Sequence, residues 1–380
     1  MKKSVLFFTA AASVFAAGSA YAAQNVANTS QKGSLLVWPL INVDQKAPSA
    51  HTTLIELSND ANATVHVECE YINEQKGRVN FDFDLTAKAT ASWDAYTLSG
   101  DHVSPPPFPS NAGTPAFPGN PARGELVCFA TDPGRMFQIA WNELIGTATV
   151  VRQDTGDSQP RQAFKYNAWA FAARNATGLA PDNNTVAQGT PGKLTLSGAN
   201  AAGAYDACPT YNIANFMPNG ARLGATRTVD NWLSVASCNQ DLRETYILHR
   251  TKLDFTVWNS NENSFTGAYA CVDSVESIPL GSAEQPSPPI VVQSSNFDYS
   301  TVGTPNARFQ VSGGAHTPPC PFPTENTGLL GVVQSGVALT GDPGVDQDVG
   351  NTTQTAGAFA PAGFVLWDVS IAPPAAPVRK

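Results

Sequence analysis

Apolar and polar residues alternate along most of this chain, and this period of two limits the fold more than any other feature. In Ala63–Tyr71, Val65, Val67, Cys69 and Tyr71 point to one side, whereas the residues between them are polar and point to the other. The pattern indicates a half-buried β-strand with its cysteine on the core face. No segment after residues 1–22 keeps a helical period, so the chain is predicted to be all-β.

The same reasoning places strands throughout the chain. Leu144–Val151 and Phe164–Phe171 flank a turn-rich segment, which predicts a long-stranded hairpin. The other strands are expected near Ser34–Trp38, Thr53–Ser58, Val79–Leu85, Thr90–Leu98, Glu125–Ala130, Lys193–Ser197, Trp232–Ser237, Lys252–Trp258, Phe265–Val272, Ala307–Val311, Leu329–Leu339 and Gly363–Val369.

Two stretches of the chain resemble each other. Thr53–Asn59, a polar turn and Val65–Cys69 have a counterpart in Leu253–Asn259, a polar turn and Phe265–Cys271. We interpret this as a tandem repeat of one β-sandwich unit. Chance similarity between two strand–turn–strand segments is the alternative.

The segment between the two halves lacks periodicity and contains Gly, Pro and Asn. It predicts two tandem Ig-like β-sandwich domains, residues 23–175 and 193–380, joined by a linker at 176–192. The Pro- and Gly-rich stretch Ser104–Pro121 falls within the first domain and is expected to be a long loop.

Residues 1–22 have the features of a secretory signal peptide. Lys2 and Lys3 precede the apolar stretch Val5–Ala17 and the A-x-A cleavage site Ala20–Ala22. The apolar stretch is too short to span a bilayer, and no later segment has 18 consecutive apolar residues. We therefore expect an exported protein without a transmembrane segment, outside the cell or on its outer surface, with the periplasm as the alternative.

Export makes disulfides available to the six cysteines, although six cysteines allow 15 pairings. Sequential pairing keeps each bond within one predicted domain. The expected disulfides are Cys69–Cys128, Cys208–Cys238 and Cys271–Cys320.

Composition and motifs exclude several functions. The formal net charge is −9 and Lys and Arg form no cluster, which argues against nucleic acid and anionic lipid as partners. The sequence contains no H-E-x-x-H and no phosphate-binding G-x-x-x-x-G-K-[ST]. Ser335 lies between Gln334 and Gly336 in VQSGV, where valines replace both glycines of a nucleophile elbow. We therefore expect a non-enzymatic protein without a cofactor, calcium being the one candidate ion.

The best calcium candidate is the loop that contains Asp342, Asp346, Asp348 and Asn351. Oxygen side chains in a Gly-containing loop suit a cation that takes six or more oxygen ligands. The loop departs from the EF-hand, since Thr353 stands where the bidentate Glu belongs. An ordinary acidic turn is the favoured interpretation.

His66, Glu68 and Glu70 share one face of a predicted strand and are a second metal candidate, for which a solvated polar face is preferred. Exposed tryptophans on a sandwich can stack on sugar rings, but most of those here are expected in the core. Trp169 is the exception, because it shares a face with Lys165 and is placed at the surface by the pattern. The seven tryptophans are Trp38, Trp93, Trp141, Trp169, Trp232, Trp258 and Trp367.

The segments TTLIELSN, ATVHVECEYIN and LDFTVWNSNENSF resemble those of a scattered group of uncharacterised exported bacterial β-proteins. The resemblance implies an exported β-protein and assigns no catalytic or binding residue.

Together these features favour a secreted or cell-surface, non-catalytic protein with a structural or adhesion role. The main alternative is a carbohydrate-binding protein or a glycoside hydrolase, because that chemistry needs only two carboxylates brought together by the fold. The partner is expected to be a protein or a glycan at the cell surface, and the oligomeric state stays open.

Overall fold

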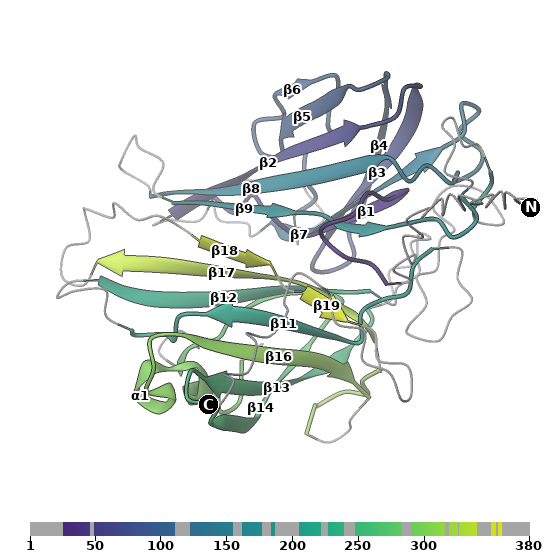
Figure 1. Ribbon diagram of the computed structural model, residues 1–380. Helices are drawn as coiled ribbons and strands as arrows, with labels where there is room; N and C mark the ends of the chain where they lie inside the picture. Colours follow the sequence, from purple (N-terminus) through teal and green to yellow (C-terminus); the bar gives the residue numbers. More distant parts are fainter. Residues whose placement is uncertain are drawn as a thin grey trace, which may run out of the picture.

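The computed structural model describes residues 26–45, 49–110, 122–154, 162–176, 184–186, 205–221, 227–238, 248–282, 290–315, 319–325, 327–339, 351–354 and 356–358. Nearly all regular structure in these ranges is β-strand, which confirms the all-β prediction. The strands form four antiparallel sheets (Figure 1). The exceptions include the 3-10 turn η2 (Ser294–Phe297) and the one-turn helix α1 (Tyr299–Val302).

The first half of the chain forms two five-stranded sheets. Sheet A has the order β10-β1-β7-β3-β4, with β1 (Leu35–Asn42), β3 (Val65–Asn73), β4 (Arg78–Leu85), β7 (Arg123–Thr131) and β10 (Trp169–Phe171). Sheet B has the order β6-β5-β2-β8-β9, with β2 (Ser49–Asn59), β5 (Thr90–Asp94), β6 (Gly100–Asp101), β8 (Leu144–Asp154) and β9 (Gln162–Asn167).

The second half forms the other two sheets. Sheet C has the order β14-β13-β16-β11-β19, with β11 (Tyr211–Phe216), β13 (Thr251–Asn259), β14 (Ser264–Val272), β16 (Ala307–Gly314) and β19 (Ala356–Ala358). Sheet D has the order β15-β12-β17-β18, with β12 (Arg227–Ser237), β15 (Val275–Pro279), β17 (Leu329–Leu339) and β18 (Asn351–Gln354).

The two halves have the same strand order. Strands β11 to β19 correspond in turn to β1, β2, β3, β4, β5, β7, β8, β9 and β10. With this correspondence, sheet C has the strand order of sheet A, and sheet D has that of sheet B without β6. This equivalence matches β3 with β13. The sequence comparison instead aligned β2 with β13, because both strands precede an Asn-containing turn, and it is therefore displaced by one strand. β2 and β3 lie in different sheets, whereas β13 and β14 pair directly.

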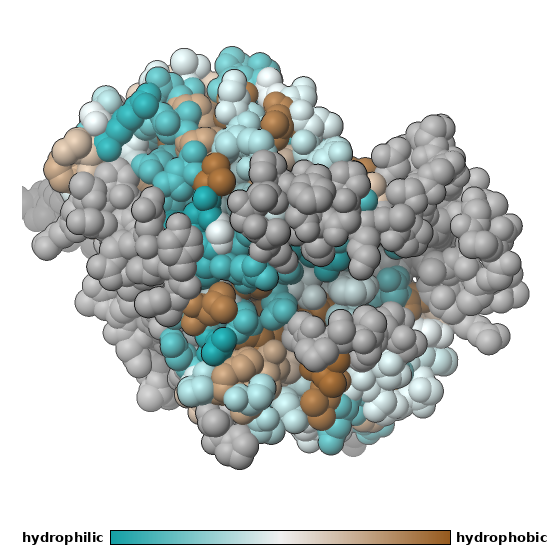
Figure 2. Space-filling view, turned by 180° about the vertical axis from the view of Figure 1, so that it is seen from behind, coloured by the Kyte–Doolittle hydropathy of each residue, from teal (hydrophilic) through white to brown (hydrophobic). Residues whose placement is uncertain are grey.

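Each half has its own hydrophobic core between its two sheets. The core of the first half includes Phe81 and Trp93, whose ring planes meet at 86° with centroids 5.8 Å apart. The core of the second half includes Leu233, Phe255 and Phe309. On the face opposite to that of Figure 1, hydrophobic residues at the surface form small groups among hydrophilic ones (Figure 2).

A third hydrophobic cluster joins the two halves. Outward-facing residues of sheet A, such as Val37 and Phe129, pack with Ala236, Val275 and Leu330 from sheet D. Every residue of β1 is buried, so this strand contributes to a core on both of its faces. Sheets A and D are therefore inner layers of the molecule, and the first half lies against sheet D in Figure 1.

The proposed boundary at 176–192 lies mostly outside the described residues. Its described part is residue 176 and residues 184–186, and the latter pair with the first half, where Thr185 forms a bridge with Ile139. Val186 N donates a hydrogen bond of 2.8 Å to Gln138 O. The domain limits stay a prediction.

The expected exposure of Trp169 is wrong. Its side chain is 0% exposed and lies in the cluster between the halves, where Nε1 donates to the Gly331 carbonyl at 3.3 Å. Lys165 and Asn167 belong to β9 in sheet B, whereas Trp169 belongs to β10 in sheet A. Because the chain changes sheets at Ala168, the alternation that holds along β9 does not carry over to Trp169.

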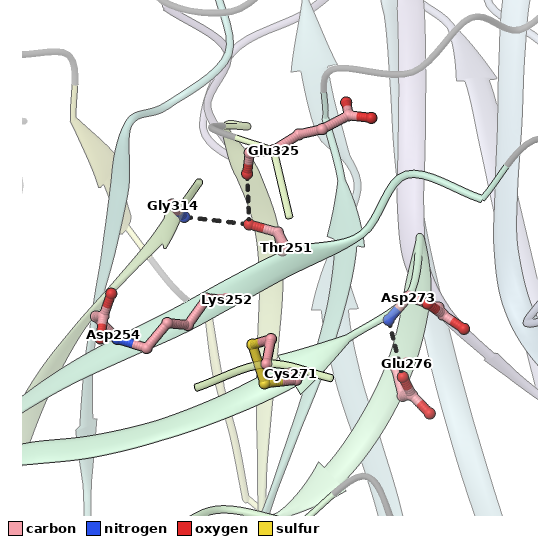
Figure 3. Close-up of a disulfide and its surroundings, with 9 residues drawn as sticks. Thr251, Lys252, Asp254, Cys271, Asp273, Glu276, Gly314 and Glu325 are labelled. Atoms are coloured by element: carbon pink, nitrogen blue, oxygen red, sulfur yellow. Dashed lines mark hydrogen bonds and ion pairs between the residues drawn. A yellow bond between two sulfur atoms is a disulfide. The ribbon is translucent and has the colours of Figure 1, made fainter. Parts of the chain in front are cut away.

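The three expected disulfides are confirmed. Cys69–Cys128 joins directly opposed residues of β3 and β7, and Cys208–Cys238 joins the segment before β11 to the residue after β12. Cys271–Cys320 joins β14 to the segment after β16 (Figure 3). The second of these bonds lies inside the cluster between the halves.

Candidate functional site

The described residues line a cleft of about 330 Å³ between the two halves. It lies over the part of sheet D that the shared hydrophobic cluster does not cover. The wall from the first half is lined by Leu40, Asn42, His51, Arg123, Arg152 and Phe164, and the wall from the second half by Asp230, Trp232, Ser277, Gln334 and Gly336.

Strand register brings the polar residues of the first wall together. Asn42 of β1 lies opposite Arg123 of β7, and His51 of β2 lies opposite Arg152 of β8. Residues directly opposed in an antiparallel pair project from the same face of a sheet. Two cross-strand pairs therefore deliver both arginines and the histidine to one end of the first sandwich.

Strand register also builds the second wall. Trp232 lies opposite Gln334, and Asp230 lies opposite Gly336, on β12 and β17. Leu233, between Trp232 and Ser234, points into the core of the second half, so alternation turns the tryptophan outward into the cleft. A Cβ at Gly336 would lie 2.4 Å from Asp230 Oδ1, so the glycine leaves room for this carboxylate.

Two cations surround a neutral histidine at the first wall. Burial, followed by the charges of Arg123 and Arg152, lowers the pKa of His51 to about 4, so the imidazole is uncharged at neutral pH. Asp44 lies behind this wall, with Oδ2 3.2 Å from Arg123 Nη2 and its carbonyl accepting a 2.7 Å hydrogen bond from His51 N. Among the described residues, His51 Nδ1 and Arg123 Nε have no hydrogen-bond partner.

The cleft thus combines an aromatic face with charged and amide groups in a volume suited to a small ligand. Small-molecule sites commonly enclose about 300–1,000 Å³ and hold a few directed polar groups. Trp232 is half-buried, which leaves part of its ring available. The arrangement can bind a compact polar molecule that also has an apolar surface.

A second cavity, of about 400 Å³, lies beside the Cys271–Cys320 disulfide. Asp273 and Glu276 lie next to each other there, and Asp273 N donates to Glu276 Oε2 at 3.1 Å (Figure 3). Burial raises the pKa of Glu276 to about 7, and the charges of Glu74 and Asp273 add to the shift. Arg250 already pairs with Asp273, at 3.1 Å. Because Asp273 is already paired with Arg250, this cavity is the weaker candidate.

The polar face of β3 was predicted to be solvated, and this prediction is wrong. The face forms a buried network of ionisable side chains. The side chains of His66 and Glu70 are almost fully buried, because β3 lies inside sheet A between β4 and β7. His66 Nδ1 lies 2.6 Å from Asp84 Oδ1, and Nε2 lies 3.2 Å from Asp82 Oδ2. Glu70 pairs with Arg78. Within the described residues, no group of three or more His, Cys, Asp or Glu side chains could hold a metal ion.

The calcium candidate remains a prediction. Asp342, Asp346 and Asp348 lie outside the described residues. Asn351 is the first residue of β18, and its side chain is likewise not described.

The described tryptophans divide into core residues and partly accessible ones, and Trp367 lies outside the described residues. Core packing is confirmed for Trp38, Trp93 and Trp141, whereas Trp232 and Trp258 are half-buried. Trp232 was not distinguished from the others in the sequence. Its place on a strand that also carries Asp230 was the available signal, since two outward residues at a spacing of two share a face.

No family model matches the sequence, and no curated protein matches it. Among solved structures, the CupB6 tip adhesin from Pseudomonas aeruginosa is similar at 10% sequence identity over 84% of this chain and 92% of that chain, with a TM-score of 0.15. A similarity at this level supports no conclusion about function. In the described part of the chain, no helix is long and apolar enough to cross a membrane.

Proposed function

We propose that this protein is exported and acts at the cell surface as a non-catalytic, structural or adhesion-type β-sandwich protein. The observation that carries the proposal is the hydrophobic cluster between the halves, which packs two sandwiches against each other instead of leaving them on a flexible tether. Three disulfides fit a protein that folds outside the reducing cytosol. The predicted signal peptide at residues 1–22 supplies the route, and the common strand order supports an origin by tandem duplication.

The experiment measures where the protein lies and whether cells need it for attachment. Cells that express the natural gene are treated with a protease that cannot enter them, and the protein is followed by immunoblot. We expect loss of the full-length chain from intact cells and weaker attachment to a surface when the gene is deleted. Protection in intact cells together with cleavage after the outer envelope is opened would indicate a periplasmic protein and contradict the proposal.

A carbohydrate-binding protein or a glycoside hydrolase is the second candidate, and the cleft between the halves favours it. Protein sites for sugars place an aromatic ring against the apolar face of the pyranose and planar polar groups against its hydroxyls, and Trp232, Gln334 and Asp230 offer both. Of the described residues that line the cleft, Asp230 is the one carboxylate, whereas glycoside hydrolysis commonly uses two. Binding without turnover is therefore the favoured form of this candidate, and a glycan array followed by a hydrolysis assay on each ligand tests it.

A further inference from the structure

We infer that the cleft between the two halves binds a saccharide that carries a carboxylate, such as a uronic acid. This inference rests on the second candidate function above, that of a sugar-binding protein, and names its ligand class.

The two walls of the cleft differ in charge. The wall from the first half presents the guanidinium groups of Arg123 and Arg152, and none of its described lining residues is a carboxylate. The opposite wall presents Trp232, Asp230 and Gln334. A ligand that is anionic at one end and rich in hydroxyls at the other satisfies both walls, because guanidinium groups bind carboxylates through charge-assisted hydrogen bonds.

Two nitrogen atoms of the first wall have no hydrogen-bond partner within the described residues. Asp44 occupies one end of the Arg123 guanidinium through Nη2, while Arg123 Nε has no hydrogen-bond partner among the described residues. The same is true of His51 Nδ1. Both atoms are buried, so a bound oxygen atom would reach them only after these side chains turn toward the cleft, and the gain in hydrogen bonding would then favour binding.

The state of His51 fits an anion beside it. Burial and the two neighbouring arginines hold its pKa at about 4, and the opposing influence of Asp44 is smaller. A carboxylate bound at this wall would favour the protonated imidazole and raise this pKa. By linkage, a ligand that raises the pKa must bind more tightly as the pH falls toward the new value.

Trp232 supplies the apolar half of the site. It is half-buried on the outer face of sheet D, and Phe164 and Leu40 lie on the wall from the first half. The CH face of a pyranose ring would stack on the indole. A small anion such as acetate has no such face, so the site should prefer the sugar acid to the free anion.

The test is calorimetric titration of the mature, disulfide-bonded protein with D-glucuronate and D-galacturonate. D-Glucose and D-galactose are matched controls, since they differ only at the carboxylate, and acetate is the competitor. We expect the uronates to bind about tenfold more tightly than the neutral sugars, the ratio that one charge-assisted hydrogen bond provides. Arg152→Gln should remove this preference, and Trp232→Ala should weaken all four sugars.

Two further variants control for charge and for aromatic loss elsewhere. Lys165→Gln removes an exposed cation from sheet B, and Trp258→Ala removes a half-buried ring from β13, which belongs to sheet C. Both should bind as the wild type does. A rise in the His51 pKa with glucuronate but not with glucose, followed by NMR titration, would locate the carboxylate at the first wall.

Equal affinity for uronates and neutral sugars would overturn the inference and leave sugar binding intact. Displacement of glucuronate by acetate at equal concentration would show a simple anion site and would also overturn it. Absence of binding to all four sugars would remove the ligand assignment, whereas the surface-exposure experiment would still decide the leading proposal on its own.

Discussion

Truncation of Trp169 to alanine tests whether the shared cluster makes the two halves unfold together. The indole is 0% exposed, and replacing a fully buried tryptophan by alanine lowers the free energy of unfolding by about 3–5 kcal/mol. The variant also loses the hydrogen bond from Nε1 to the Gly331 carbonyl, worth about 1 kcal/mol. Because the two contributions overlap, we expect a loss of about 4 kcal/mol, a large fraction of the roughly 5–15 kcal/mol that holds a domain folded.

The measurement is guanidinium unfolding under non-reducing conditions, followed by far-UV circular dichroism and by scanning calorimetry. The matched control is Trp93→Ala, which removes a tryptophan that is 3% exposed but lies in the core of the first half alone. We expect one transition for the wild type and two for Trp169→Ala, since the lost contacts connect the halves. Trp93→Ala should destabilise the first half, and it should uncouple the two halves less than Trp169→Ala does.

Two outcomes would refute this reasoning. Separate transitions in the wild type would mean that the cluster does not couple the halves. A loss below about 1 kcal/mol in the free energy of unfolding of Trp169→Ala would mean that the indole is not packed as a core residue, because truncation of a buried tryptophan costs more than that.

The remaining predictions concern charge. The pKa of Glu276 rises from 4.5 to about 7 on folding, so between these values the folded chain keeps a proton that the unfolded chain has lost. The free energy of unfolding should therefore fall as the pH rises through this window, by at most about 3 kcal/mol, and Glu276→Gln should abolish the fall in urea titrations across pH. Glu70→Gln leaves Arg78 buried without its ion pair and should lower the free energy of unfolding by about 3–5 kcal/mol. The double variant Glu70→Gln/Arg78→Met should be less destabilised, and additive effects in the double-mutant cycle would contradict this. If calcium binds the loop after β17, it should raise the Tm of the wild type but not of Asp346→Ala/Asp348→Ala, and an equal shift in both would exclude the site.

Alternation along the sequence was sufficient to locate most strands, because each needs only one core-facing side. The expected strand Leu329–Leu339 coincides with β17, and Val79–Leu85 lies within β4. β11 was missed because a polar residue stands at one of its buried positions: Asn212 is 0% exposed, and its Nδ2 donates to the Leu329 carbonyl at 2.8 Å. β15 was missed because it is a five-residue edge strand that ends in proline.

The shared cluster and the cleft lay beyond this reasoning for a different reason. Alternation assigns each strand one buried face, whereas β1 and β7 are buried on both. The continuous apolar run Leu35–Trp38 was the available signal, since strands buried on both faces lose their polar side. The cleft depends on which strands are opposed across the two halves, and a period of two carries no information about that.

The contact between the halves also joins unlike faces. Sheet A meets sheet D, and by strand order sheet D is the counterpart of sheet B. The contact therefore joins two different surfaces, and a contact of this kind can repeat from one unit to the next. A third sandwich added through the same contact would have to pack on sheet B or on sheet C. Sheet B presents Glu56 and Lys165 there, paired at 3.1 Å, and sheet C presents Lys252 and Asp254. As in the capping repeats of solenoid proteins, charged side chains on these two faces disfavour the packing of a further unit through the same apolar contact.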